Sequence, residues 1–78
     1  MNITLNGNPH TVADGASITT IVSQVTGRPL APNGQATDGR KLGVAVAHNA
    51  QVVPRSQWFA TVLAEGDDIE LVTAVQGG

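Results

Sequence analysis

Cysteine is absent from this 78-residue chain, which excludes a disulfide framework, a thiolate metal site, an iron–sulfur cluster and a cysteine nucleophile. Lysine and arginine together number four, charged residues make up 13% of the chain, and the net charge is −2 at pH 7. These values give no electrostatic case for binding nucleic acid. Aromatic residues are also scarce, at 3%, which disfavours a stacking platform for bases.

Long apolar runs and a basic leader are missing as well. No apolar stretch approaches the ~18 residues that a transmembrane helix requires, and the first residues lack the basic segment that opens a secretory signal. The sequence therefore predicts no membrane association and a cytoplasmic location. Its length suits one small domain, and no internal repeat or linker indicates a second one. We expect a single domain over residues 1–78.

The first half of the chain predicts a hairpin and a helix. Residues 1–6 alternate between apolar and polar side chains, which is the pattern of a half-buried strand. Asn6-Gly7-Asn8 favours a turn into a second strand at residues 10–13, and Pro9 predicts that this strand lies at a sheet edge. A helix is expected to begin after Ser17 as N-cap and to end at Gly27. Its apolar stripe comprises Ile18, Ile21, Val22 and Val25.

The second half predicts a surface loop and three further strands. Residues 28–42 hold scattered prolines and glycines with little periodicity, which favours a mobile surface loop over a binding lid. Strands are expected at residues 44–47, at 52–53 as a short edge and at 69–74, with Ser56 capping a helical turn between the last two. The final strand is apolar on both faces, which predicts a central position covered by the domain itself or by a partner. The predicted core comprises Ile3, Leu5, Ile18, Ile21, Val22, Val25, Val46, Leu63, Ile69 and Leu71.

Side chains with catalytic potential show no pattern of an active site. The two histidines, His10 and His48, have no metal-ligand spacing, and half-exposed strand positions explain them better. The acidic stretch Glu65 to Glu70 lacks the oxygen spacing of a calcium loop, so a solvated turn or a surface for a basic partner is favoured. No nucleophile elbow or phosphate-binding loop occurs. We expect no metal site and no enzyme activity in the chain itself.

The C-terminus is the group best suited to chemistry. Residues 75–78, Val75-Gln76-Gly77-Gly78, follow the last predicted strand and form a short flexible tail. Gly77 and Gly78 have no Cβ and can enter a channel too narrow for side chains. The α-carboxylate of Gly78 is ionised at pH 7, since its reference pKa is about 3.3–3.7, and it could attack an activated phosphorus. A frayed end without function is the alternative interpretation.

Five segments in this order resemble a known family. They are Ile3-x-Leu5-Asn6-Gly7, Val44-Ala45-Val46-Ala47-x-Asn49, Val53-Pro54-Arg55-x-x-Trp58, Leu63-x-x-Gly66-Asp67-x-Ile69-Glu70 and Ala74-Val75-Gln76-Gly77-Gly78. Together they are similar to the thiamine-pathway sulfur carriers, which are small ubiquitin-like β-grasp proteins. The chain departs from the family in the length of residues 28–42 and in His48, where an aliphatic residue is expected; neither departure involves the tail.

The resemblance implies an α+β fold, a ubiquitin-like β-grasp with a mixed four- to five-stranded sheet and one main helix packed across it. It also implies that an E1-like enzyme uses ATP to adenylate Gly78, that a cysteine desulfurase relay supplies sulfur, and that the thiocarboxylate donates this sulfur to thiazole synthase. The chain would bind no cofactor itself. Gly77, Gln76 and Val75 would give access to the partner's channel, and Arg55, Asp67 and Glu70 are candidate partner contacts.

Three alternatives stay open on the sequence alone. The first is a sulfur carrier of another pathway, similar to the small subunit of molybdopterin synthase, although the segment from Val53 to Trp58 and the residues before the glycines favour thiamine. The second is a ubiquitin-like modifier that forms isopeptide bonds through Gly78. The third is a non-covalent β-grasp module that does not use its terminus.

Overall fold

The computed structural model describes residues 1–31, 33, 37 and 43–73. Their secondary structure confirms the predicted succession of a hairpin, one helix and three further strands. In chain order the elements are β1 (Asn2–Leu5), β2 (Asn8–Thr11), α1 (Ile18–Thr26), β3 (Val44–His48), β4 (Gln51–Val52), the short 3-10 helix η1 (Arg55–Gln57) and β5 (Asp68–Thr73).

The five strands form one mixed sheet in the order β2-β1-β5-β3-β4. β5 pairs in parallel with β1 and antiparallel with β3, so the last strand of the chain is the central one, as its two apolar faces predict. β2 is an edge strand, and this confirms the position expected from Pro9. The parallel central pair, two flanking hairpins and a single helix make up the arrangement of a ubiquitin-like β-grasp fold.

Both hairpins turn through asparagine in a left-handed conformation. The β1–β2 turn has φ of 51° at Asn6 and 81° at Gly7, and the β3–β4 turn has φ of 50° at Asn49 and 70° at Ala50. Two successive residues with positive φ give a turn whose twist matches that of the strands it joins. Asparagine and glycine adopt this conformation at low cost, whereas alanine does so at a steric penalty. The sequence predicted the first turn, but Ala50 concealed the second.

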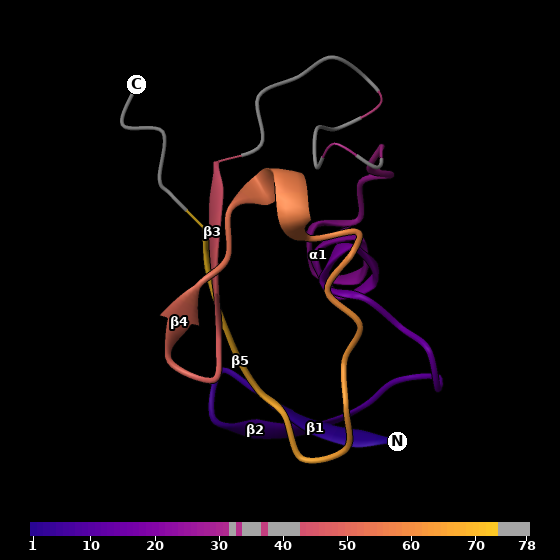
Figure 1. Cartoon of the computed structure of the whole chain (residues 1–78), viewed down its shortest axis with the longest axis vertical. Coiled ribbons are helices and arrows are strands. Elements are labelled where there is room, and N and C mark those ends of the chain that lie inside the picture. The colour runs from indigo at the N-terminus through magenta and orange to yellow at the C-terminus, as the bar shows by residue number, and fades with distance from the viewer. Residues whose placement is uncertain (32, 34–36, 38–42, 74–78) are drawn as a thin grey trace.

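Helix α1 lies across one face of the sheet (Figure 1). Ser17 is its N-cap, and the backbone N–H of Ser17 donates to Oγ1 of Thr20 at 3.3 Å. Gly27 ends the helix with φ of 70°, and its N–H donates to the Ser23 carbonyl at 2.9 Å. Both caps confirm the sequence prediction. None of the helices among the described residues is long and apolar enough to cross a bilayer.

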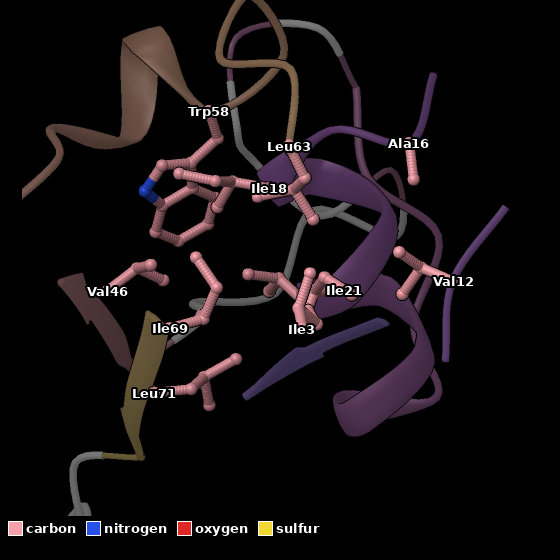
Figure 2. Packing of buried hydrophobic residues seen from close by; sticks show 11 residues of the cluster. Ile3, Val12, Ala16, Ile18, Ile21, Val46, Trp58, Leu63, Ile69 and Leu71 are labelled. Carbon is pink, nitrogen blue, oxygen red and sulfur yellow. The ribbon is translucent and has the colours of Figure 1, made fainter. Parts of the chain in front are cut away.

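The core lies between α1 and the inner face of the sheet, where side chains from the helix and from strands β1, β3 and β5 converge (Figure 2). Trp58 is 1% exposed and closes one end of this core, and its indole Nε1–H donates to the Val53 carbonyl at 3.0 Å. The buried hydrophobic residues are Ile3, Val12, Ala16, Ile18, Ile21, Val22, Val46, Trp58, Leu63, Ile69 and Leu71.

Three predictions differ from the structure, and a fourth is not tested by it. Val25 is 46% exposed, since the described part of the chain does not cover the last turn of α1. Leu5 is only partly buried at the rim of the core. Pro54, whose fixed φ suits the start of a helical turn, takes the N-cap position of η1 in place of Ser56. The surface-loop prediction for residues 28–42 falls largely outside the described residues.

Candidate functional site

β5 connects the centre of the sheet to the C-terminal residues. It is held between β1 and β3, and its last described residue, Thr73, pairs with Val44 of β3. The predicted tail of Val75, Gln76, Gly77 and Gly78 lies outside the described residues. Thr73 nevertheless fixes where this segment begins, because residues 74–78 can extend no more than ~18 Å from it. Any chemistry at Gly78 therefore takes place close to this end of β5.

The sheet surface opposite α1 carries an apolar patch beside this end of β5. Side chains alternate between the two faces of a strand. Val46, Ile69 and Leu71 are buried on the inner face, so the residues next to them in the sequence lie on the opposite face of the sheet. Register places Ala45 opposite Val72 and Ala47 opposite both Glu70 and Val52. Val52 is 78% exposed and Val72 is 62% exposed. We call this surface the outer face and define it by Ala45, Ala47, Val52, Glu70 and Val72.

Glu70 is the only charged member of the outer face. It is exposed and lies in the middle of β5, next to the apolar residues. The sequence predicted it as a partner contact, and its position on an open sheet surface makes such a contact geometrically available. An apolar surface that includes a carboxylate suits a partner with a matching apolar surface and a basic group.

Arg55, another predicted contact, lies on η1 beside the core tryptophan. Its guanidinium Cζ is 5.7 Å from the centroid of the Trp58 ring, a distance at which the cation is attracted to the ring face. Arg55 is half-buried, and its side chain lies over an indole that is itself held by Val53. The ring thus limits the positions that the guanidinium can take.

Asp67, the third predicted contact, joins separate segments of the chain. Its Oδ2 accepts from Nε2 of His48 and from the backbone N–H of Ala64, each at 2.8 Å, and its Oδ1 accepts from Nδ2 of Asn49 at 3.2 Å. Its side chain is only 12% exposed. These internal bonds explain why an aspartate stands in the turn before β5. A contact between Asp67 and a partner stays a prediction.

The environment of Asp67 also changes its acidity. Burial raises the pKa of the Asp67 carboxyl, but hydrogen bonds from Ala64, His48 and Asn49 and the attraction of His48 outweigh it and lower the pKa below the ordinary 3.8. His48, half-exposed at the end of β3 as expected, thus serves as a partner of Asp67. The pairing of His48 with Asp67 explains why a histidine stands where the resemblance predicts an aliphatic residue.

Groups that could bind a metal do not cluster in the described part of the chain. No set of three or more histidine, aspartate or glutamate side chains comes together within it. His10 lies half-buried in β2, opposite Ile3 of β1 and away from the pair of His48 and Asp67. The outer face beside the start of the tail is the feature that suits a carrier or binding protein.

Sequence reasoning missed the composition of the outer face and the role of two asparagines. The apolar character of β5 on both sides indicated a covered strand, but the contributions of Ala45, Ala47 and Val52 required the register of the sheet. The sequence predicted a turn at Asn6 but not at Asn49; both residues lie in turns, and their side chains also bond to β5. Their preference for positive φ gave no signal of this second role.

Comparison with known proteins agrees with the fold and defines the family. The ThiS family model matches residues 3–78, so it extends through both terminal glycines. The crystal structure of the thiamine biosynthesis protein ThiS from Geobacter metallireducens superimposes with a TM-score of 0.69 at 29% identity, covering 100% of both chains. The chain belongs to the ThiS family.

Two curated relatives add the biochemical context. The sulfur carrier protein ThiS of Escherichia coli (strain K12) is 44% identical over 41 residues, which are 53% of this chain and 62% of that protein. A thiazole synthase of Magnetococcus marinus is 38% identical over 78 residues, which are 100% of this chain and 20% of that protein. The matched segments thus span under two thirds of the first relative and a fifth of the second.

Proposed function

We propose that this chain is a sulfur carrier for thiamine biosynthesis that transports sulfur as a thiocarboxylate on Gly78. The observation that supports this most directly is the ThiS family match, which continues from the folded body through Gly77 and Gly78. β5, the central strand of the sheet, ends at Thr73, five positions before Gly78 in the sequence. The chain would act as a carrier and co-substrate, with the catalytic groups supplied by its partners.

The proposed chemistry begins with adenylation by an E1-like partner. A carboxylate oxygen of Gly78 attacks the α-phosphorus of ATP, pyrophosphate leaves, and an acyl adenylate remains. The outer sulfur of a persulfide on a cysteine desulfurase relay then attacks the carbonyl carbon, AMP departs and an acyl disulfide remains. A second thiol attacks the relay sulfur of this acyl disulfide, so that a disulfide forms between the two thiols and the C-terminal thiocarboxylate is released. Glycine favours each step because no side chain stands beside the reacting carbonyl.

Thiazole synthase is the proposed acceptor of the sulfur. A segment similar to this whole chain makes up 20% of a protein named thiazole synthase in Magnetococcus marinus. In that protein a carrier-like segment and a synthase share one polypeptide, which keeps them at high effective concentration. We infer that the carrier domain reaches the synthase by docking on its surface.

We assign the docking of both the synthase and the activating enzyme to the outer face. Val52 and Val72 are 78% and 62% exposed, and burying such apolar area is the main driving force of protein association. Val72 lies immediately before Thr73, so a partner seated on this face has the C-terminal residues within reach. Glu70 lies within the patch, and Arg55 on η1 is a candidate contact for an acidic group at its rim.

The terminal glycine provides the test of the carrier function. We expect deletion of Gly78, or Gly78→Val, to abolish ATP–pyrophosphate exchange with the activating enzyme and to leave the fold unchanged. Deletion withdraws the carboxylate by ~3.3–3.6 Å, whereas reacting atoms must approach to about 3–3.5 Å. Valine keeps the reach but places a β-branched group beside the carbonyl.

Intact mass measurement completes this test, because it separates free carboxylate, thiocarboxylate and an isopeptide conjugate. Circular dichroism and the thermal midpoint serve as controls for folding. Wild-type exchange rates from both folded variants would contradict the carrier function and favour a non-covalent interaction module. A conjugate in place of the thiocarboxylate would favour a modifier.

A further inference from the structure

The side chain of Asn6 forms hydrogen bonds with the last part of β5. Its Oδ1 accepts from the backbone N–H of Leu71 at 2.8 Å, and its Nδ2 donates to the Leu71 carbonyl at 3.2 Å. Asn6 belongs to the turn after β1, where φ is 51°. The carboxamide therefore presents an acceptor and a donor to β5 in the way that a strand backbone would.

This amide extends the parallel pairing beyond the end of β1. The register of β1 with β5 ends at Leu5 opposite Ile69, and the last backbone bond runs from Asn6 N–H to the Ile69 carbonyl at 2.9 Å. At Gly7 the chain turns away into β2, so no backbone of β1 is left to face Leu71. The Asn6 side chain takes that place, and it holds β5 two residues before Thr73.

Turn geometry alone does not explain this contact. Asparagine followed by glycine is favoured at such a turn for its backbone conformation. This preference does not determine the orientation of the asparagine carboxamide. A comparison is provided by Asn49, which has φ of 50° in the β3–β4 turn. Its Oδ1 accepts from the backbone N–H of Asp68 at 2.9 Å. The two turn asparagines thus hold opposite ends of β5.

We propose that Asn6 is a positioning residue for the carrier reaction: its bonds to Leu71 set the direction in which β5 delivers the C-terminal residues to a partner. This inference rests on the proposed function. β3 stays paired with β5 as far as Thr73, and the residues after Thr73 span at most ~18 Å, so a change of about 10° in the direction of β5 displaces the far end by up to ~3 Å. Such a displacement exceeds the tolerance of reacting atoms, because a misplacement of about 1 Å can cost ~100-fold in rate.

The test compares Asn6→Gly with Asn49→Gly. Glycine keeps the positive φ of each turn and removes only the carboxamide, so both variants should lose thermal stability to a similar degree. We expect Asn6→Gly to lower kcat for adenylation by about 100-fold, with KM within about twofold because the outer face is intact. Asn49→Gly should keep the wild-type kcat. Amide exchange should accelerate at Leu71 in the first variant and at Asp68 in the second.

The conservative variant Asn6→Asp tests the effect on kcat of losing one of the two hydrogen bonds to Leu71. Its carboxylate still accepts from the Leu71 N–H but cannot donate to the Leu71 carbonyl, so kcat should lie between those of wild type and Asn6→Gly. If Asn6→Gly is unfolded at the assay temperature, Asn6→Asp provides the test instead. The proposal is overturned if Asn6→Asp has the wild-type kcat although its Leu71 amide exchanges faster than in wild type. Equal kcat for the two folded glycine variants also overturns it. An inactive wild type would instead mean failure of the proposed carrier function.

Discussion

At the scale of single residues, Asp67 shows how one carboxylate can connect three segments. It accepts hydrogen bonds from His48 at the end of β3, from Asn49 in the β3–β4 turn and from Ala64 before β5. Hydrogen bonds to an ionised group contribute more to stability than those between neutral groups. The turn that starts the central strand is therefore held by one ionisable side chain.

The lowered pKa of Asp67 predicts a pH-dependent contribution to stability. Because the folded protein favours the carboxylate, this contribution is fully present above the ordinary pKa of 3.8 and is lost as the pH falls through the lower folded value. Asp67→Asn should reduce the free energy of unfolding by about 1–3 kcal/mol at pH 7. The difference from wild type should shrink below about pH 4.

Urea unfolding at pH 7, 4 and 3 measures this difference. Asp68→Asn is the matched control, since Asp68 adjoins Asp67 and its side chain is exposed. The free energy of unfolding of Asp68→Asn should stay close to that of wild type. If the difference in free energy of unfolding between wild type and Asp67→Asn is constant over this pH range, the pH-dependent contribution assigned to Asp67 is wrong.

At the scale of elements, α1 shows that its apolar stripe is only partly used. Ile18 and Ile21 are fully buried against the sheet (Figure 2). Val22 is also fully buried, whereas Val25 on the same stripe is 46% exposed. The helix is rich in threonine, valine and isoleucine, which have weak helix propensity. Its stability therefore depends on docking through the buried part of the stripe.

Truncation at two positions of α1 tests this dependence. Ile21→Ala should reduce the free energy of unfolding by about 2–5 kcal/mol, because it removes a fully buried side chain and leaves a cavity. Val25→Ala should reduce it by under about 1 kcal/mol, since the side chain is already half in water. Urea denaturation measures both values. Equal losses at the two positions would refute the burial of α1 described here.

At the scale of the whole molecule, the sheet divides the surface into two sides. α1 covers the inner face (Figure 1), whereas Val52 and Val72 on the outer face are exposed in the described part of the chain. The proposed carrier function needs a surface that brings several partners to the same terminus. An open apolar face next to that terminus meets this need without a separate binding element.

A charge placed on either side of the molecule tests the docking assignment. Val72→Lys should raise the KM of the activating enzyme for the carrier by about tenfold, equivalent to about 1.4 kcal/mol, and should leave kcat at saturation nearly unchanged. Val62→Lys is the matched control, because Val62 is 59% exposed and Val72 is 62% exposed. Val62 pairs with Ser17 at the start of α1, away from the outer face. The same KM for both variants would exclude the outer face as the docking surface.

The sequence by itself determined the order of the elements, both caps of α1, the central place of β5 and the edge position of β2. Each of these follows from local physics: side-chain periodicity, the conformational freedom of Gly27, or the missing N–H of Pro9. The role of the glycine pair at the terminus stays a prediction, which the sequence indicates because the proposed chemistry needs a carboxylate without neighbouring side chains.

Only the tertiary structure decided which residues from distant segments meet. The register of β3 with β5 and β4 assembles the outer face, and the parallel pairing of β1 with β5 brings Asn6 to Leu71, 65 positions along the chain. His48 and Asp67 likewise lie 19 positions apart. Such contacts depend on strand alignment and packing over the whole domain, so no local pattern of side chains encodes them.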